Sequence, residues 1–347
     1  MEKRTENFLK KTKIIFSDQI TLPALLHKNE HRIYIIDENI TMIHQDLISK
    51  ITANEPTYIL RATETNKNVK ELMNLIGFLD QKLITRNHMV IAIGGGITTD
   101  LTGFAASIYK RGCGLILVPT SFLAMIDAAV GGKTGVNFKG IKNTLGTFYP
   151  ADETYIVLDF LKSLPLEEIR NGWSECLKVA FISNSPLLNI LETNKDKKLT
   201  REIIELAIEI KTDICTSDPF DMEIRRHLNL GHTFAHLLET ALKNELSHGE
   251  AVAVGIRLAA DFSSDLGYLD SDACNRIKHL LEFYDLSSRV NENSKTTLLD
   301  NAVDILNKDK KRTESGKLNL VLFRNIQQVF VKAIEIDVVL KILKKYL

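Results

Sequence analysis

The sequence contains few cysteines, and they stand far apart. Cys113, Cys176, Cys215 and Cys274 form no CxxC pair, so neither a zinc ribbon nor a dithiol redox motif is indicated. Each lies in an apolar or mixed run, where a cysteine most often packs as a small hydrophobic side chain. We therefore expect four buried thiols that take no part in chemistry.

Long apolar runs and an excess of charge are also missing. No apolar run approaches the roughly 18 residues that span a bilayer, and the basic beginning, MEKRTENFLKKTK, is not followed by the apolar stretch of a secretory signal. Lysine plus arginine equals aspartate plus glutamate at 44 each, so no overall field favours nucleic acid or a membrane surface. We expect a cytoplasmic protein without nucleic-acid or membrane partners.

The first half alternates short β-branched runs with helical patterns. Between two of these runs, residues 68–84 (NVKELMNLIGFLDQKLI) carry apolar side chains at helical spacing. The runs that read as buried strands are Arg32–Asn39, Pro56–Ala62, His88–Gly96 and Gly114–Thr120. Such alternation predicts a parallel α/β sheet, whose ligands gather at the carboxyl ends of the strands.

After Tyr155–Phe160 the pattern becomes mostly helical. The length of 347 residues allows two domains. The step from Leu164 to Pro165 suits a boundary, because proline disfavours helix in the preceding residue and fits a helix start. We predict an α/β domain over residues 1–164 and a mostly α-helical domain over residues 165–347.

Three consecutive glycines follow one of the predicted strands. Gly94, Gly95 and Gly96 precede a helical pattern, and at such a turn the backbone can approach a pyrophosphate, whose charge the helix start favours. The triplet is not GxGxxG, and alone it is a tight turn about as often. Asp100 near the helix start has a comparable alternative explanation as a partner of the helix dipole.

Histidines and one glutamate provide candidate metal ligands in the second half. His232 and His236 lie four residues apart on one face of a predicted helix, and His248 starts another helical run. Glu175 lies inside an otherwise largely apolar helix. Two imidazoles and a carboxylate suit a divalent transition metal with open positions for substrate. The alternative is packed or surface histidines. His236 could be a fourth ligand by spacing, but we prefer a supporting or acid–base role, because a catalytic metal needs vacant positions.

Six separated segments together resemble the successive signatures of the 3-dehydroquinate synthase family. The segments are GGGITTDLTGFAASIYKRG, VPTSFLAMIDAAVGGKTGVN, GIKNTLGTFYPA, GWSECLKVAFIS, RRHLNLGHTFAHLLET and LSHGEAVAVGI. The match runs from about Glu64 to Lys311 in the family's order and spacing. It implies a dehydroquinate synthase-like fold, with an α/β NAD-binding N-terminal domain and a mostly α-helical metal- and substrate-binding C-terminal domain.

The resemblance implies residue roles by position in these motifs. Glu175, His232 and His248 match the metal ligands, with zinc or cobalt as the metal. The positions that match NAD contacts are Asp37, Glu64, Lys67, Gly94, Gly95, Gly96, Thr99, Asp100, Thr120, Ser121, Lys133, Lys142, Phe160, Leu161, Lys162 and Ser163. The positions that match the substrate side are Arg111, Asp127, Lys133, Asn143, Lys178, Lys211, Arg225, Asn229, His236 and Lys310. In the DKK run the match falls on Lys310 or Lys311, and we take Lys310.

The family's activity implies a phosphate-eliminating lyase with catalytic NAD and a divalent metal. Its substrate is a phosphorylated sugar acid, 3-deoxy-D-arabino-heptulosonate 7-phosphate, its product is 3-dehydroquinate, and it forms a homodimer. One alternative is a cyclase that makes an inosose or valiolone, which would not need Lys211, Arg225 and Asn229 for a carboxylate. A polyol dehydrogenase of the same superfamily would need fewer anion-binding cations, and an inactive homologue would have lost a metal ligand or a lysine.

Overall fold

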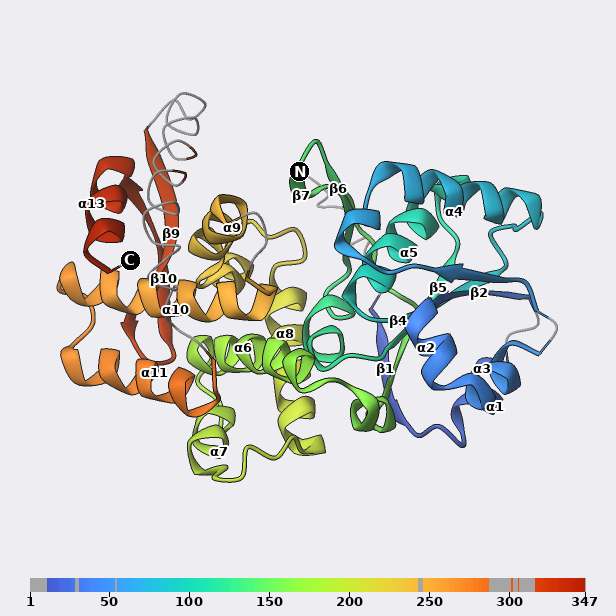
Figure 1. Cartoon of the computed structure of the whole chain (residues 1–347), viewed down its shortest axis with the longest axis horizontal. Coiled ribbons are helices and arrows are strands. Elements are labelled where there is room, and N and C mark those ends of the chain that lie inside the picture. Colours follow the sequence, from blue (N-terminus) through green and yellow to red (C-terminus); the bar gives the residue numbers. More distant parts are fainter. Residues whose placement is uncertain are drawn as a thin grey trace, which may run out of the picture. The chain divides into compact units, whose positions relative to one another are not determined.

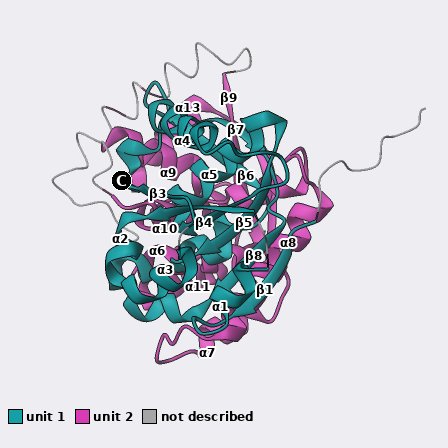
Figure 2. Ribbon diagram, turned by 90° about the vertical axis from the view of Figure 1, so that its right-hand side faces the viewer, with its two compact units in different colours: residues 1–169 teal, residues 170–347 magenta. Residues whose placement is uncertain are grey.

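The computed structural model describes residues 11–28, 31–53, 55–242, 246–286, 301, 305 and 316–346. The chain divides into two compact units, residues 1–169 and 170–347 (Figure 2). The domain boundary that the sequence places after residue 164 stays a prediction.

A six-stranded sheet forms the centre of the first unit, and every neighbouring pair of strands is parallel. The order is β1-β8-β5-β4-β2-β3. The strands are β1 (Lys13–Ser17), β2 (Arg32–Asp37), β3 (Thr57–Leu60), β4 (Met89–Gly94), β5 (Gly114–Pro119) and β8 (Glu153–Val157). Because the chain leaves β2 for β3 on one side and returns to β4 on the other, the strand order reverses between β2 and β4. Ligands bind at such switch points in open α/β sheets.

Helices cover both faces of this sheet (Figure 1). The helices of the first unit are α1 (Leu22–Leu26), α2 (Glu38–Ile43), α3 (Gln45–Thr52), α4 (Val69–Gln81) and α5 (Gly96–Ile108). Leu72, Leu75 and Leu79 of α4 pack with Leu101 and Ala105 of α5 in one core cluster, which includes alternate residues of the central strands. The central strands are apolar over nearly their whole length because both faces are buried.

Short 3-10 or π-helical turns and one hairpin complete the first unit. The hairpin pairs β6 (Lys133–Phe138) with β7 (Ile141–Phe148) in antiparallel register. The turns are η1 (Glu64–Asn66), η2 (Tyr109–Arg111), η3 (Ala124–Ala128) and η4 (Leu158–Ser163).

The second unit is mostly helical. Its helices are α6 (Leu166–Ile182), which begins just before the division, α7 (Leu187–Thr193), α8 (Arg201–Ser217), α9 (His232–Ala241), α10 (His248–Asp265), α11 (Ser271–Phe283) and α13 (Ile336–Tyr346), with the turn η5 (Ile224–Asn229). An antiparallel hairpin of β9 (Lys317–Asn325) and β10 (Gln328–Glu335) packs against α10. Of the described helices, none has the length and apolarity to cross a membrane.

These observations confirm the predicted fold class, and all four cysteines are buried, as expected. The sequence did not predict β1, β8 or the two hairpins. The hairpin β6–β7 buries few residues and lacks a clean apolar alternation, so its sequence carries little strand signal.

Candidate functional site

Glu175 is a carboxylate in the buried part of a helix. Every residue of α6 from Asn171 to Ile182 is buried, and Glu175 is only 1% exposed. An ionised carboxylate in such surroundings is costly unless cations or hydrogen-bond donors compensate it.

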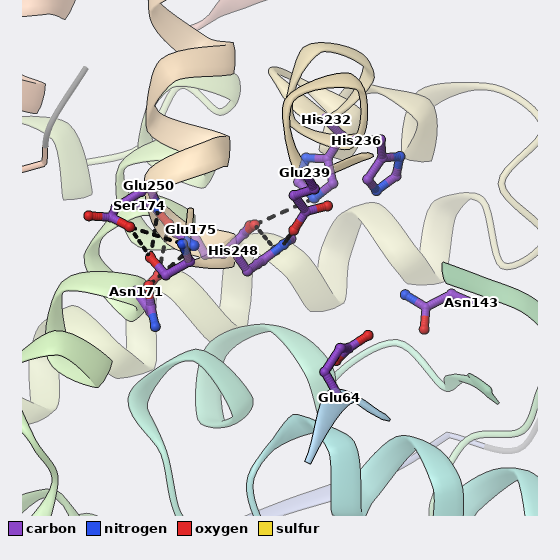
Figure 3. Close-up of polar contacts among 12 residues, drawn as sticks. Glu64, Asn143, Asn171, Ser174, Glu175, His232, His236, Glu239, His248 and Glu250 are labelled. Carbon is purple, nitrogen blue, oxygen red and sulfur yellow. Dashed lines mark hydrogen bonds and ion pairs between the residues drawn. The ribbon is translucent and has the colours of Figure 1, made fainter. Parts of the chain in front are cut away.

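Two imidazole rings converge on this carboxylate from the first residues of two other helices. The Nε2 atom of His232, which starts α9, lies 3.5 Å from Glu175 Oε1, and Nε2 of His248, which starts α10, lies 3.4 Å from the same oxygen. One candidate ligand atom from each residue lies within 4.8 Å of the other two. Figure 3 shows the rings and the carboxylate turned toward one another. The structure therefore brings together the three candidate ligands that the sequence analysis named.

Lys178 places a buried ammonium group beside the same carboxylate. It lies one helical turn after Glu175 in α6, is 2% exposed, and forms an ion pair with Glu175 Oε2. Burial by itself would raise the pKa of Glu175, but the Lys178 ammonium and the two imidazoles hold it well below its ordinary value. The carboxylate is therefore ionised at neutral pH.

The Nδ1 atoms of both histidines face hydrogen-bond acceptors. His232 Nδ1 lies 3.3 Å from the carbonyl oxygen of Leu230, and His248 Nδ1 lies 3.3 Å from Glu239 Oε1. For His232, burial and the Lys178 ammonium lower the pKa of the ring. For His248, burial opposes protonation, but contacts with Glu175 and Glu239 raise the pKa to about 9. The sequence analysis missed Glu239, whose only signal is an acidic residue on the buried side of α9.

The donor set of this cluster fits a divalent metal ion. Within the described residues neither Glu175 oxygen accepts a hydrogen bond of ordinary geometry, so its contacts are the ion pairs with Lys178 and the histidines. Two imidazole Nε2 atoms and a carboxylate oxygen, with Nδ1 occupied on each ring, are a common catalytic arrangement for zinc, and His248 would give up its Nε2 proton when an ion binds.

A pocket of about 600 Å³ opens next to His232 in the second unit. His236 and Asn229, both predicted on the substrate side, also line it. The His236 ring is exposed and lies edge-on to His232, with ring centroids 5.8 Å apart. The remaining lining residues include Asp221, Arg226, Thr233, Leu237, Thr240 and Asn319. The pocket gives a small polar molecule access to His232.

Two further predicted cations of this unit are buried. Lys211 in α8 is 7% exposed and Arg225 in η5 is 2% exposed. Arg225 Nη1 donates to the carbonyl oxygen of Pro219 at 2.8 Å, and its backbone N–H donates to Asp218. Lys310, the last predicted substrate contact, lies outside the described residues.

In the first unit the glycine triplet lies at the reversal of strand order. Gly94 ends β4, Gly95 precedes α5, and Gly96 is the first residue of that helix, whose start has no side-chain cap among the described residues. A Cβ on Gly94 would lie 2.5 Å from Thr98 Oγ1 and 3.0 Å from Asp37 Cβ. The backbone is therefore held close to Asp37, at the end of β2. A bare helix start flanked by glycines fits a dinucleotide phosphate.

Most of the predicted nucleotide contacts gather at this edge of the sheet. Thr120 and Ser121 follow β5, Phe160–Ser163 lie in η4 after β8, and the Thr120 N–H donates to the Gly94 carbonyl oxygen at 3.0 Å. Asp127 lies in η3, also after β5. Arg111, which was predicted on the substrate side, does not lie at this edge. It follows α5 and precedes β5, and so lies toward the amino ends of the strands.

Lys67 connects the hairpin to the start of α5. Its Nζ lies 2.5 Å from Asp100 Oδ2 and 2.6 Å from Asn143 Oδ1, and the side chain is buried. Asn137 extends the network, since it donates to Glu64 Oε1 and accepts from the Asn143 backbone N–H. Lys133 and Lys142 lie on the same hairpin. The sequence analysis predicted nucleotide or substrate contacts for these residues other than Asn137, which it did not name, and it did not predict their mutual hydrogen bonds.

Comparisons with known proteins agree with this geometry. The family model described as 3-dehydroquinate synthase N-terminal matches residues 57–171, and the C-terminal model matches residues 172–312. The 3-dehydroquinate synthase of Alkaliphilus metalliredigens is 35% identical over 307 residues, or 85% of each chain. That of Helicobacter pylori is 36% identical over 290 residues, or 83% of each chain.

A solved structure shows the same fold. It is 2-epi-5-epi-valiolone synthase from Streptomyces hygroscopicus subsp. jinggangensis with NAD+ and Zn2+ bound, which is 24% identical and covers 99% of each chain with a TM-score of 0.85.

Proposed function

The chain belongs to the 3-dehydroquinate synthase family, and from this premise we propose that it converts 3-deoxy-D-arabino-heptulosonate 7-phosphate into 3-dehydroquinate and phosphate. The reaction is a step of the shikimate pathway toward aromatic amino acids. The observation that carries the proposal is the convergence of Glu175, His232 and His248 in a chain that both family models match in succession. The resemblance also supports a cytoplasmic homodimer.

Glu175, His232 and His248 would hold a divalent metal ion, zinc or cobalt. Such an ion, when bound, lowers the pKa of a coordinated substrate hydroxyl group and so favours its oxidation. The Nδ1 contacts of both histidines direct Nε2 toward the ion, and the pocket beside His232 admits the substrate. Lys178 stays beside Glu175, where its ammonium group can donate a hydrogen bond to a substrate oxygen.

Gly94, Gly95 and Gly96 would receive the pyrophosphate of NAD, and Asp37 would accept from a ribose hydroxyl group. NAD, when bound, would supply reversible hydride chemistry and would not be consumed. The chain's own contribution is a backbone that approaches closely at Gly94 and donor N–H groups at the start of α5. Lys67 holds Asp100 and Asn143 in place at this edge.

The buried cations Lys211 and Arg225, with Asn229, would bind the substrate carboxylate. A carboxylate leaves water at little cost only where cations and donors replace its hydration, and both cations are already largely desolvated. His236 lines the pocket with an exposed ring, so it can move a proton between a substrate hydroxyl group and solvent.

A phosphate-release assay tests the proposal. Purified protein is mixed with NAD, Zn2+ and the heptulosonate phosphate, and released phosphate and absorbance of NADH are followed together. We expect stoichiometric phosphate without net NADH. Glu175→Ala should lose bound zinc and turnover together, whereas Glu167→Ala, an exposed carboxylate in the first turn of the same helix, should keep both.

Two outcomes contradict the proposal. Turnover of glucose 6-phosphate in place of the heptulosonate phosphate would assign the chain to the inosose-forming cyclases. Full activity of Glu175→Ala would refute the assignment of Glu175 as a metal ligand that the reaction needs.

A further inference from the structure

Glu239 is a buried carboxylate that contacts a candidate metal ligand. It lies two turns after His232 in α9, is 2% exposed, and has Oε1 3.3 Å from Nδ1 of His248 (Figure 3). The helices α9 and α10 pack against each other, which brings Glu239 to the first residue of α10. The contact therefore joins two separate helices next to the proposed metal.

The ring of His248 lies between two carboxylates. Its Nε2 atom faces Glu175 Oε1 at 3.4 Å, and its Nδ1 atom faces Glu239 Oε1 at 3.3 Å. A carboxylate at Nδ1 accepts a hydrogen bond from Nδ1–H, so when the ring loses its other proton to bind an ion, the lone pair that becomes available is on Nε2. Glu239 thus selects the tautomer that can coordinate a metal on the Glu175 side.

The other histidine has a different partner at the equivalent atom. His232 Nδ1 faces the carbonyl oxygen of Leu230, a neutral acceptor supplied by the backbone. The same orientation is therefore achieved without a charge. The carboxylate at His248 adds a negative charge behind the ring, which makes Nε2 a stronger donor to a cation.

We propose that Glu239 is a positioning residue for the metal, which fixes the orientation and tautomer of His248 and strengthens its bond to the ion. The inference rests on the proposed function, since it requires that Glu175, His232 and His248 bind a metal. Partners of this kind change metal affinity by about 10- to 100-fold when they are removed. Glu239→Ala should therefore weaken zinc binding by a factor in this range.

Glu239→Gln separates orientation from charge. The glutamine side chain has nearly the same shape and keeps a carbonyl oxygen that can accept from Nδ1–H, but it carries no charge. We expect an affinity between those of wild type and Glu239→Ala. The matched control is Glu250→Gln, because Glu250 lies in the first turn of α10 but contacts Ser247 and neither histidine among the described contacts.

The measurement is zinc affinity of the metal-stripped full-length protein, obtained by competition with a chromophoric chelator. Thermal unfolding of the metal-free variants is recorded in parallel. The ligand-field absorption of bound Co2+ reports the coordination geometry. We expect Glu239→Ala and Glu239→Gln to lower zinc affinity and alter the Co2+ spectrum, with Glu250→Gln close to wild type in both.

The outcomes separate this inference from the proposed function. If wild type binds zinc no better than Glu175→Ala does, the proposed metal site is refuted, and the proposed function with it. If Glu175→Ala loses zinc while both Glu239 variants bind it as wild type does, the metal site stands and the role of Glu239 is refuted. The role is also refuted if Glu239→Ala and Glu250→Gln lose affinity equally, because the effect would then reflect general destabilisation of α10.

Discussion

In the second unit, nearby lysines or backbone N–H groups stabilise the negative charge of several buried carboxylates. Glu175 lies beside Lys178, and Asp261 contacts Lys278 at 3.1 Å. Asp218 uses backbone donors instead, since its carboxylate accepts from the N–H groups of Met222, Glu223 and Arg225. It thereby anchors the loop that leads to Arg225 and Asn229, two residues proposed to bind the substrate carboxylate.

The Asp218 anchor predicts a specific pH dependence. Burial alone would raise the pKa of Asp218, but the three backbone N–H groups outweigh it and lower the pKa below its ordinary value. Asp218 therefore adds stability above the ordinary pKa of about 4, and the contribution is lost as pH falls through the lowered folded-state value. Asp218→Asn should lower the free energy of unfolding by about 1–2 kcal/mol at pH 7. The difference in this free energy between variant and wild type should shrink below about pH 4.

Urea unfolding of both proteins between pH 7 and pH 3 measures this difference. A gap that stays constant with pH would mean that the charge of Asp218 is not what anchors the loop. The same variant should raise KM for the substrate, because Arg225 takes its backbone position from Asp218.

The residues that converge at the candidate metal site could be named from the sequence, whereas their supporting contacts could not. Glu175, His232 and His248 lie in motifs that resemble a family, and their residue types suit a metal. Glu239 carries no such signal, because its importance comes from the packing of α9 on α10. The hydrogen bonds of Lys67 were missed for the same reason, since Asp100 and Asn143 are distant in sequence.

At the scale of elements, the turn from β4 to α5 depends on the absence of a side chain at Gly94. Gly94→Ala would place a methyl group 2.5 Å from Thr98 Oγ1 and 2.7 Å from Thr98 Cβ. The turn must then shift, and the N–H groups at the start of α5 move with it. We expect at least a roughly 10-fold loss of NAD affinity, equivalent to about 1.4 kcal/mol, measured by calorimetry.

Gly77→Ala is the matched control. Gly77 lies within α4, and a Cβ there would meet nothing within 4 Å. Alanine stabilises an exposed helix interior by up to about 1 kcal/mol relative to glycine, so this variant should bind NAD normally and unfold at a slightly higher temperature. Unchanged NAD binding by Gly94→Ala would exclude the glycine turn as the phosphate site.

Element prediction succeeded where a segment's own pattern decides its structure. The four strands that the sequence predicted all form, with ends within about two residues of those in the structure. The two hairpins were not predicted, because the strand conformation of β6 and β9 depends on packing against their partner strands more than on their own sequence pattern. The pattern of β9 is also apolar over a run too short to separate strand from helix.

At the scale of the whole molecule, metal binding should be visible in stability. The three proposed ligands come from α6, α9 and α10, so a bound ion links three helices of the second unit. A ligand that binds only the folded state at 1,000 times its Kd adds about 4 kcal/mol. We expect a chelator to lower the unfolding temperature of the zinc-loaded wild type and to leave Glu175→Ala unchanged.

Differential scanning calorimetry with and without chelator gives this comparison, with Glu167→Ala as the variant that should behave like wild type. Equal shifts in wild type and Glu175→Ala would place the stabilising ion elsewhere in the chain.

The ion pair between Lys178 and Glu175 has a consequence for biogenesis. Many small zinc domains cannot fold until the ion arrives, because metal binding supplies most of their folding free energy. Here Lys178, one helical turn away in the same helix, neutralises the charge of Glu175. The newly made chain can therefore fold before it binds its metal. We therefore expect the metal-free protein to be folded and to gain activity when zinc is added.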